Sequence, residues 1–263
     1  MYQYQSFTNE NYNVFLEDFA IRLNGCHYTP NSTDDGGCGN FRRPNVTSAG
    51  PIERHLVPTM TQLWASADAC SFVAEATLPE EAHVFAGAPS KVMISVAVAG
   101  TTISWDVVQV DKTATRLPES SFFSFVPKVN PEGWRLSVLG SEMDPTDVLA
   151  KPSPDSKMED AVYGGSPHLR GVQAASWAGA TGALGNNAGK GGASFVLSSL
   201  DVPVLSTGIA SPFVSPRNEV PDMLGGVHYN IFQNIWNTNY VLWYPYDGVD
   251  KHIRSRFELA ITA

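Results

Sequence analysis

The stretch VMISVAVAGTTISWDVVQV, residues 92–110, is the part of the chain that decides its fold class. Residues 92–98 are apolar and rich in valine and isoleucine, and Gly100 then allows a turn. Residues 101–110 return with the same character. Two such runs joined by a short glycine-containing connection predict an antiparallel β-hairpin.

Further runs of this kind lie on both sides of the hairpin, separated by turn residues. The chain holds 22 glycines and 18 prolines, which favours many turns over long helices. Strands at this spacing predict an all-β fold, a large antiparallel β-sandwich. The other predicted strands are residues 72–78, 121–126, 134–139, 195–200, 228–236, 240–244 and 253–261.

The N-terminal part has a different character. The segment Asn9–Asn24 predicts a helix, because apolar residues recur at helical spacing, Thr8 or Asn9 can cap it and Gly25 ends it. Residues 26–60 contain scattered prolines and little periodicity, so we expect an extended, loop-rich passage. The predicted division is an N-terminal helix and arm over residues 1–60 and a β-sandwich domain over residues 61–263.

Residues 179–192, GATGALGNNAGKGG, are almost free of large side chains and predict a flexible surface loop. Their glycines and Lys190 raise the question of a phosphate-binding loop. Such a loop needs Gly-Lys-Ser/Thr at the start of a helix, whereas Gly191 and Gly192 follow this lysine. Nucleotide binding is therefore not expected.

The excess of acidic over basic residues argues against some classes of binding partner. Asp and Glu number 26 against 17 Lys and Arg, a formal net charge of −9. Nucleic-acid binding requires an excess of basic residues, so a nucleic-acid partner is not expected. The chain holds no apolar run of about eighteen residues, so no membrane-spanning helix is expected either.

The three cysteines leave the compartment open. Cys26 and Cys38 flank a loop rich in Gly, Asp and Asn, and a disulfide between them would close that loop. Cys70 would then be a free, buried thiol. Three cysteines without tight spacing make a poor zinc site, and the sequence points to no metal and no cofactor.

Two glycosylation acceptors, Asn31 and Asn45, lie in the same N-terminal region. Together with a Cys26–Cys38 disulfide they favour a secretory or extracellular origin. The first six residues lack the basic and apolar regions of a signal peptide. We therefore expect either a cytosolic protein or a longer precursor in which Met1 is not the native start.

Residues 225–245, GGVHYNIFQNIWNTNYVLWYP, form an aromatic–amide stretch without an ionised side chain. Aromatic faces mixed with uncharged amides suit sugars, which present apolar C–H faces and hydroxyls together. The alternative is a core strand that ends in a polar turn, since aromatic residues also favour strands. The candidate carbohydrate-binding residues are Trp236, Trp243 and Tyr244 for stacking and Asn234, Asn237 and Asn239 for hydrogen bonds to hydroxyls.

Charged residues gather just before the strand at residues 121–126. Arg116 could make a bidentate contact to the carboxylate of a ligand. The alternative, which we favour, is a structural brace formed by Asp111, Arg116 and Glu119, because most polar clusters of this kind are paired internally.

His228 is a candidate general base. On a strand, His228 and Asn230 share one face, while Tyr229 and Ile231 share the other. A lone histidine is more often a structural hydrogen-bond donor, and the sequence shows no partner that would orient it. The Gly-x-Ser-x-Gly motif of serine hydrolases is absent from the sequence.

Three blocks of the sequence resemble, in order, the C-terminal portion of poorly characterised glycoside hydrolases related to the family 38 α-mannosidases. The first is YQSFT at residues 4–8 with FLEDF at residues 15–19 and Arg43-Pro44-Asn45. The second is DKTATRLPE at residues 111–119 with FFSF at residues 122–125. The third runs over residues 226–244, with SLDVP at residues 199–203 before it, and it departs from the family pattern at Asn237, where a glycine is expected.

This resemblance implies a large sandwich of the supersandwich type, as in the C-terminal part of mannosidases and in galactose-mutarotase-like proteins. In full-length relatives the sandwich follows an α/β barrel that holds the catalytic carboxylate and zinc ligands. No catalytic residue is carried over to this chain, because the barrel is absent from it. The resemblance therefore implies a carbohydrate-associated accessory part, non-catalytic by itself, that binds a glycan or serves a catalytic-domain partner.

Two other functions stay open from the sequence. Sandwiches of this kind also support lyase and mutarotase-type chemistry, in which His228, Tyr229 and Arg116 would be the working groups if they converge in one cleft. Alternatively, the aromatic–amide stretch is a protein–protein interface for a catalytic-domain partner or for a second copy in a homo-oligomer.

Overall fold

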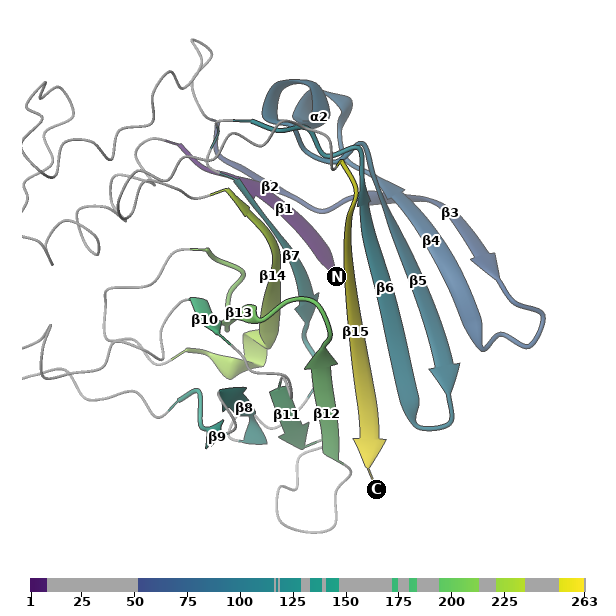
Figure 1. Ribbon diagram of the computed structural model, residues 1–263, viewed down its shortest axis with the longest axis vertical. Helices are drawn as coiled ribbons and strands as arrows, with labels where there is room; N and C mark the ends of the chain where they lie inside the picture. The colour runs from purple at the N-terminus through teal and green to yellow at the C-terminus, as the bar shows by residue number, and fades with distance from the viewer. Residues whose placement is uncertain are drawn as a thin grey trace, which may run out of the picture.

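The computed structural model describes residues 1–8, 52–115, 117, 119–128, 133–138, 141–146, 172–174, 180–183, 194–212, 221–234 and 251–262. Within these residues the chain forms two antiparallel β-sheets, one short α-helix and one 3-10 turn, η6 (Met223–Gly225) (Figure 1). The predicted all-β class is confirmed. No helix in this part of the chain is long and apolar enough to cross a membrane.

Sheet A has six strands in the order β10-β13-β14-β7-β1-β2. Its central strand β7 is buried along its whole length and pairs with β1 on one side and β14 on the other. The strands of sheet A are β1 (Tyr2–Ser6), β2 (Arg54–Leu56), β7 (Glu119–Phe125), β10 (Val172–Ala174), β13 (Val204–Thr207) and β14 (Val227–Asn234).

Sheet B has nine strands in the order β3-β4-β5-β6-β15-β12-β11-β8-β9. β5 and β6 form the hairpin that residues 92–110 predict, and Gly100 in its turn has a φ of 60°. The strands of sheet B are β3 (Thr59–Ala65), β4 (Ser71–Thr77), β5 (Lys91–Ala99), β6 (Thr102–Val110), β8 (Arg135–Val138), β9 (Ser141–Met143), β11 (Ala180–Ala183), β12 (Ser194–Ser199) and β15 (Ile253–Thr262).

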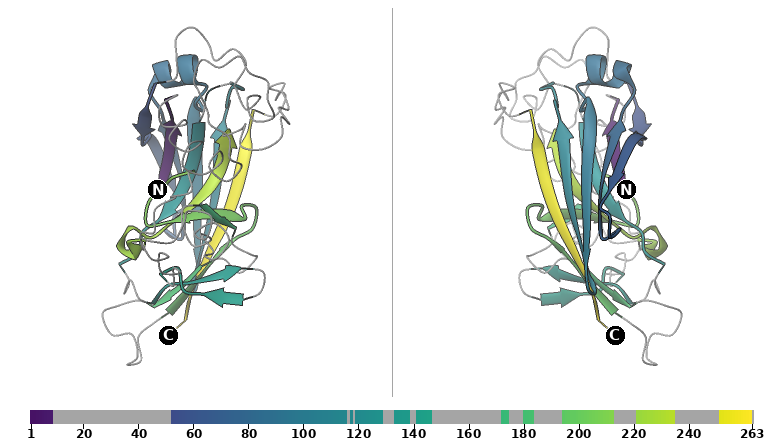
Figure 2. Two further views of the ribbon diagram at one scale, coloured as in Figure 1. Left: turned by 90° about the vertical axis from the view of Figure 1, so that its left-hand side faces the viewer. Right: turned by 90° about the vertical axis from the view of Figure 1, so that its right-hand side faces the viewer.

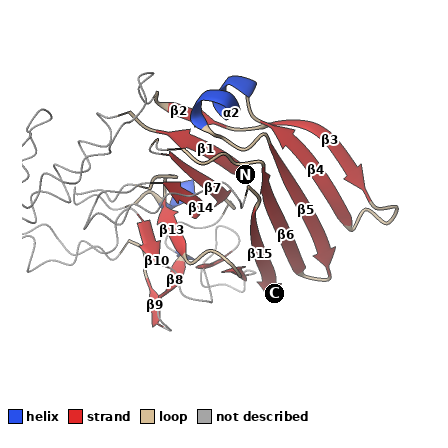
Figure 3. Ribbon diagram, turned by 45° about the horizontal axis from the view of Figure 1, so that its top comes forward, coloured by secondary structure: helices blue, strands red, loops and turns tan. Residues whose placement is uncertain are grey.

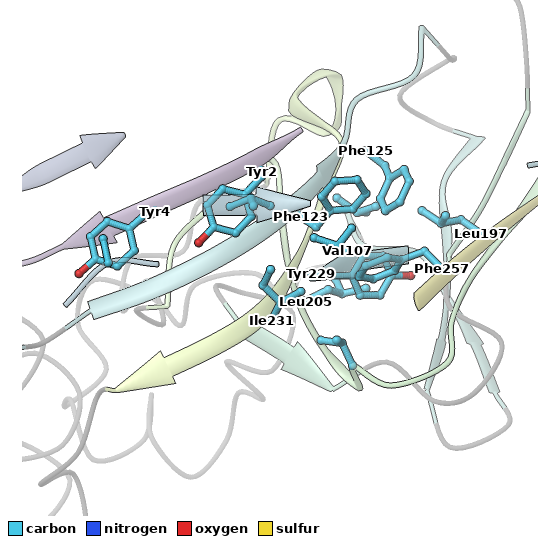
Figure 4. Close-up of a cluster of buried hydrophobic side chains, with 14 of the residues drawn as sticks. Tyr2, Tyr4, Val107, Phe123, Phe125, Leu197, Leu205, Tyr229, Ile231 and Phe257 are labelled. Atoms are coloured by element: carbon cyan, nitrogen blue, oxygen red, sulfur yellow. The ribbon is translucent and has the colours of Figure 1, made fainter. Parts of the chain in front are cut away.

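The two sheets pack face to face through aromatic side chains, shown in Figure 4. Phe123 and Phe125 of β7 lie 5.2 and 5.5 Å from the ring of Phe257 on β15. Tyr229 of β14 reaches the same ring at 5.1 Å. Large aromatic side chains bury much apolar area, and edge-to-face pairs add to it, so this cluster fixes sheet A onto sheet B.

Part of sheet B extends beyond sheet A, as Figures 1 and 3 show for β3 and β4. The inward-facing side chains Met60 and Leu63 of β3, Phe72 of β4 and Val98 of β5 are still 59%, 56%, 39% and 41% exposed. Among the described residues, this region of the sheet is therefore a single layer.

The N-terminal strand belongs to the sandwich. β1 lies between β7 and β2 inside sheet A, so residues 2–6 are part of the core rather than of a separate arm. Helix α2 (Glu80–Ala86), which begins after Pro79 and ends at Gly87, was not predicted from the sequence. α2 lies at the end of the molecule opposite the C-terminal end of β15 (Figure 2).

Two predictions about loops are corrected by the structure. Ala180–Ala183, inside the expected flexible loop, forms β11 between β12 and β8, since strand pairing uses the backbone and needs no large side chains. Cys70, expected to be buried, is exposed because it lies in the turn between β3 and β4. The predicted helix at residues 9–24 and the strand at residues 240–244 lie outside the described residues.

Candidate functional site

The outward face of sheet B carries a groove with a volume of about 320 Å³. Two neighbouring rows of side chains line it, and both rows cross β4, β5, β6 and β15. One row is Ser71, Ala97, Ser104 and Glu258, and the other is Val73, Ser95, Asp106 and Arg256.

The strand period of two places both rows on the side away from the core. On β15, Arg256 and Glu258 are exposed, whereas Phe257 between them is buried against sheet A. On β6, Trp105 lies between Ser104 and Asp106 and packs inward, 5.1 Å from the ring of Phe125. The groove is therefore open to solvent rather than part of the core.

Small side chains form the floor of the groove. Opposite residues on antiparallel strands have Cβ atoms about 5 Å apart, and serine and alanine are too short to fill the space above them. The hydroxyl groups of Ser71, Ser95 and Ser104 have no hydrogen-bond partner among the described residues. Three hydroxyls on three successive strands thus remain available to a ligand.

Two arginine–aspartate pairs border the floor. Arg254 holds both carboxylate oxygens of Asp106, with Nε 2.9 Å from each and Nη2 donating to Oδ2 as well. Arg256 donates from Nη2 to Asp201 Oδ1 at 2.7 Å and from Nε to Oδ2 at 3.0 Å. These hydrogen bonds from Arg256 hold the pKa of the Asp201 carboxyl below its ordinary value.

Apolar surface completes the site at two places. Leu200, which is 53% exposed, lines the groove directly after β12. The row of Asp106 also continues onto β3, where Trp64 pairs with Val73 and is 47% exposed. The groove and its surroundings therefore combine hydroxyls, charge pairs and apolar side chains on the outward face of sheet B.

His228, the candidate general base, lies on the opposite sheet, on the face of β14 that points away from the core. Its ring is 5% exposed, and Nδ1 lies 2.8 Å from Ser124 Oγ. Burial lowers the pKa of His228 to about 4, so the ring is neutral near pH 7. Tyr229 points the other way, into the core. Two of the three side chains that the lyase-type hypothesis needs in one cleft are therefore on opposite faces of β14, and the third, Arg116, lies outside the described residues.

Asn234 is the one candidate sugar-binding residue within the described part of the chain. Its side-chain amide donates to the carbonyl oxygens of Thr115 and Leu117, at 2.9 and 3.0 Å. This amide therefore stabilises the connection before β7 by hydrogen bonds to its backbone. The other candidates, Trp236, Asn237, Asn239, Trp243 and Tyr244, lie outside the described residues.

Two members of the predicted brace, Asp111 and Glu119, have different partners at different places in the structure. Glu119 is buried and binds Lys112 Nζ at 2.8 Å, because it points inward from β7. Asp111 lies in the connection after β6, 3.7 Å from His83 and 3.6 Å from Lys251. The remaining candidates, Arg116, Cys26, Cys38, Asn31 and Asn45, lie outside the described residues.

Trp64 and the three serines of the groove floor were not predicted from the sequence. A signal was present, because Ser71 on β4, Ser95 on β5 and Ser104 on β6 are small polar residues within apolar strands. Only the register between strands brings them together, and that register is not readable from each strand alone.

No protein-family model matches the chain, and no curated protein matches it. Among solved structures, a galactose mutarotase-like protein from Clostridium acetobutylicum is similar, at 12% sequence identity and a TM-score of 0.30. The aligned region covers 78% of this chain and 66% of that chain, just under two thirds of its length. A likeness of this size assigns neither a family nor an activity, and it does not point to the family 38 α-mannosidases.

Proposed function

We propose that this chain binds neutral carbohydrate in the groove of sheet B and acts as a non-catalytic, accessory protein. The observation that carries the proposal is the group of three serine hydroxyls, without a hydrogen-bond partner among the described residues, on a solvent-exposed sheet face bordered by two oriented arginine–aspartate pairs. A sugar offers hydroxyls to such groups and apolar C–H faces to the valine, leucine and tryptophan beside them.

The charges of the groove favour a neutral ligand. Arg254 and Arg256 are each neutralised by an aspartate, so neither is a free cation that would attract phosphate or sulfate. Glu258 adds a carboxylate to the lining. Carboxylates held by arginine still have lone pairs that can accept hydrogen bonds from ligand hydroxyls.

The same charge pairs support a binding role over hydrolysis. Glycoside hydrolases use a pair of carboxyl groups, one of them protonated near neutral pH by a raised pKa. Asp106 and Asp201 are instead held by arginines, and the pKa of Asp201 is lowered. The Asp201 carboxylate is therefore suited to accept hydrogen bonds and unsuited to donate a proton, and Asp106 already accepts hydrogen bonds from Arg254.

Titration of the full chain with a panel of neutral glycans, followed by calorimetry, tests the proposal. Ser104→Leu fills the floor and is expected to weaken binding by at least about tenfold, because it occupies the space of the ligand. Thr102→Leu is the matched control, since Thr102 lies on the same face of the same strand but outside the groove. Equal affinities of the two variants, or no binding by the unmodified protein, would contradict the proposal.

Two finer hypotheses from the sequence stay proposals. The first is descent from family 38-related glycoside hydrolases, with a catalytic-domain partner. The second is sugar contact by Trp236, Trp243 and Tyr244 of the aromatic–amide stretch. Trp243→Ala in the same titration addresses the second, and loss of affinity is the expected result.

A further inference from the structure

We infer that the ligand is an oligosaccharide that lies across the strands of sheet B, with one of its sugar rings stacked on Trp64. This inference rests on the proposed function and extends it from the groove to the edge of the sheet. It makes Trp64 a specificity-determining residue that selects for chain length.

Among the three tryptophans in the described residues, Trp64 is the one whose ring is left outside the core. Trp105 packs 5.1 Å from Phe125, and Trp134 packs 5.5 Å from Phe195. Trp64 makes no aromatic contact with any described residue, and it is 47% exposed. Tryptophan is enriched at binding interfaces, because it offers a large apolar face together with an N–H group that stays in water.

The register places this ring in line with the groove. Trp64 pairs with Val73, Val73 with Ser95, and Ser95 with Asp106. Asp106 in turn pairs with Arg256. Strands lie about 4.8 Å apart, so the row from β3 to β15 spans roughly 19 Å.

That length exceeds one sugar ring, which is about as wide as a single strand spacing. One ring bound over Ser95 and Ser104 therefore cannot reach Trp64, and contact with both places requires several linked rings. The surface between them is the side chain of Val73, which offers apolar contact and no obstructing charge.

Within the described part of the chain, the row also stays open past Trp64. β3 is the edge strand of sheet B, and all of its residues are exposed. Among the described residues, no strand lies beyond it to close the row. The site therefore suits an internal segment of a longer glycan rather than a chain end held in a closed pocket.

Calorimetric titration with one glycan series of increasing length tests this inference. We expect the affinity of the unmodified protein to rise with chain length and then level off. Trp64→Ala should weaken binding of the long members roughly three- to tenfold, since one stacking contact is lost, and leave the shortest members unchanged. Leu63→Ala is the matched control, because Leu63 is the neighbouring residue, is similarly exposed and faces the other side of β3.

The outcomes separate the inference from the proposed function. Binding without length dependence, or an equal loss at all lengths in Trp64→Ala, overturns the inference and leaves the groove as a site. Binding of the long members unchanged by Trp64→Ala also overturns it. No binding of any member to the unmodified protein overturns the proposed function itself. Trp64→Phe, which keeps an aromatic face, should retain part of the length dependence.

Discussion

The carboxylate of Glu119 accepts hydrogen bonds from three side chains inside the sandwich. The donors are Tyr4 Oη at 2.6 Å, Thr115 Oγ1 at 2.7 Å and Lys112 Nζ at 2.8 Å. Lys112 also lies over the ring of Phe232, 4.6 Å from its centroid. Burial lowers the pKa of Lys112, and the charge of Glu119 opposes that shift. A buried pair of this kind is costly to break because each charge is left without its partner.

Lys112→Met is therefore expected to destabilise the fold by about 3–5 kcal/mol, since it leaves the Glu119 carboxylate buried without a cation. Urea unfolding followed by tryptophan fluorescence measures this change. The double variant Lys112→Met with Glu119→Leu should regain part of the loss, because it removes both charges. A single variant as stable as the unmodified protein would contradict the account.

Because His228 is buried, we expect the folded protein to lose stability as the pH becomes acidic. Its pKa in the folded state is about 4, lowered from 6.5 by burial, so the folded protein favours the neutral ring. As the pH falls, His228 takes up a proton in the unfolded chain before it does so in the folded protein. The stabilising contribution of the neutral His228 ring is therefore fully present above pH 6.5 and is lost as the pH falls toward 4. The shift corresponds to roughly 3 kcal/mol.

The free energy of unfolding measured at pH 7 and pH 4.5 tests this, with His228→Gln as the comparison. The unmodified protein should lose more stability over this interval than the variant. Acid effects of carboxylates are common to both proteins and cancel in the difference. If the free energy of unfolding of both proteins changed equally with pH, the burial of His228 would not be the cause of the loss of stability.

At the scale of elements, two glycine turns have the same handedness but different surroundings. Gly87 ends α2 with a φ of 67°, and Gly100 joins β5 to β6 with a φ of 60°. A Cβ at Gly87 would lie 2.8 Å from the carbonyl oxygen of Thr113, whereas a Cβ at Gly100 would meet nothing within 4 Å. The first turn is therefore constrained by its neighbours and the second only by its backbone.

Gly100→Ala is expected to cost about 1–2 kcal/mol from the left-handed backbone alone. Gly87→Ala should cost clearly more, because the connection after β6 must also move away from α2. Thermal unfolding of the two variants side by side gives the comparison. Equal losses of stability in both variants would mean that the connection after β6 can move away from α2 without a cost in free energy.

The strands that could be predicted from the sequence are those whose run of apolar residues is by itself typical of a strand. Residues 92–110 form β5 and β6, and the segments at residues 72–78 and 253–261 match β4 and β15 within a residue. The helix α2 was missed because its seven residues are too few to show a helical period. The groove was missed for another reason, since it arises from the pairing of strands and not from any one of them.

At the scale of the whole molecule, the proposed site lies where sheet B reaches past sheet A. Its inward neighbours at the groove, such as Phe257 and Trp105, are packed against β7, whereas Phe72 and Leu63 further along are exposed. Within the described residues, the floor of the groove thus packs on the core at one end and is a free-standing sheet at the other. Trp64 lies at the free-standing end.

The position of β15 has a consequence for how the protein is made. β15 lies between β6 and β12, and the hydrogen-bonded pair of Arg254 on β15 and Asp106 on β6 joins residues that are 148 apart in sequence. While a ribosome is still producing the chain, β6 has an unpaired edge, and sheet B cannot close until residues 253–262 emerge. We expect refolding from urea to be slow, in the range of milliseconds to seconds, as is usual for sandwiches with distant pairings. A chain stopped at residue 250 should show no cooperative unfolding, so the nascent protein depends on β15 to escape aggregation.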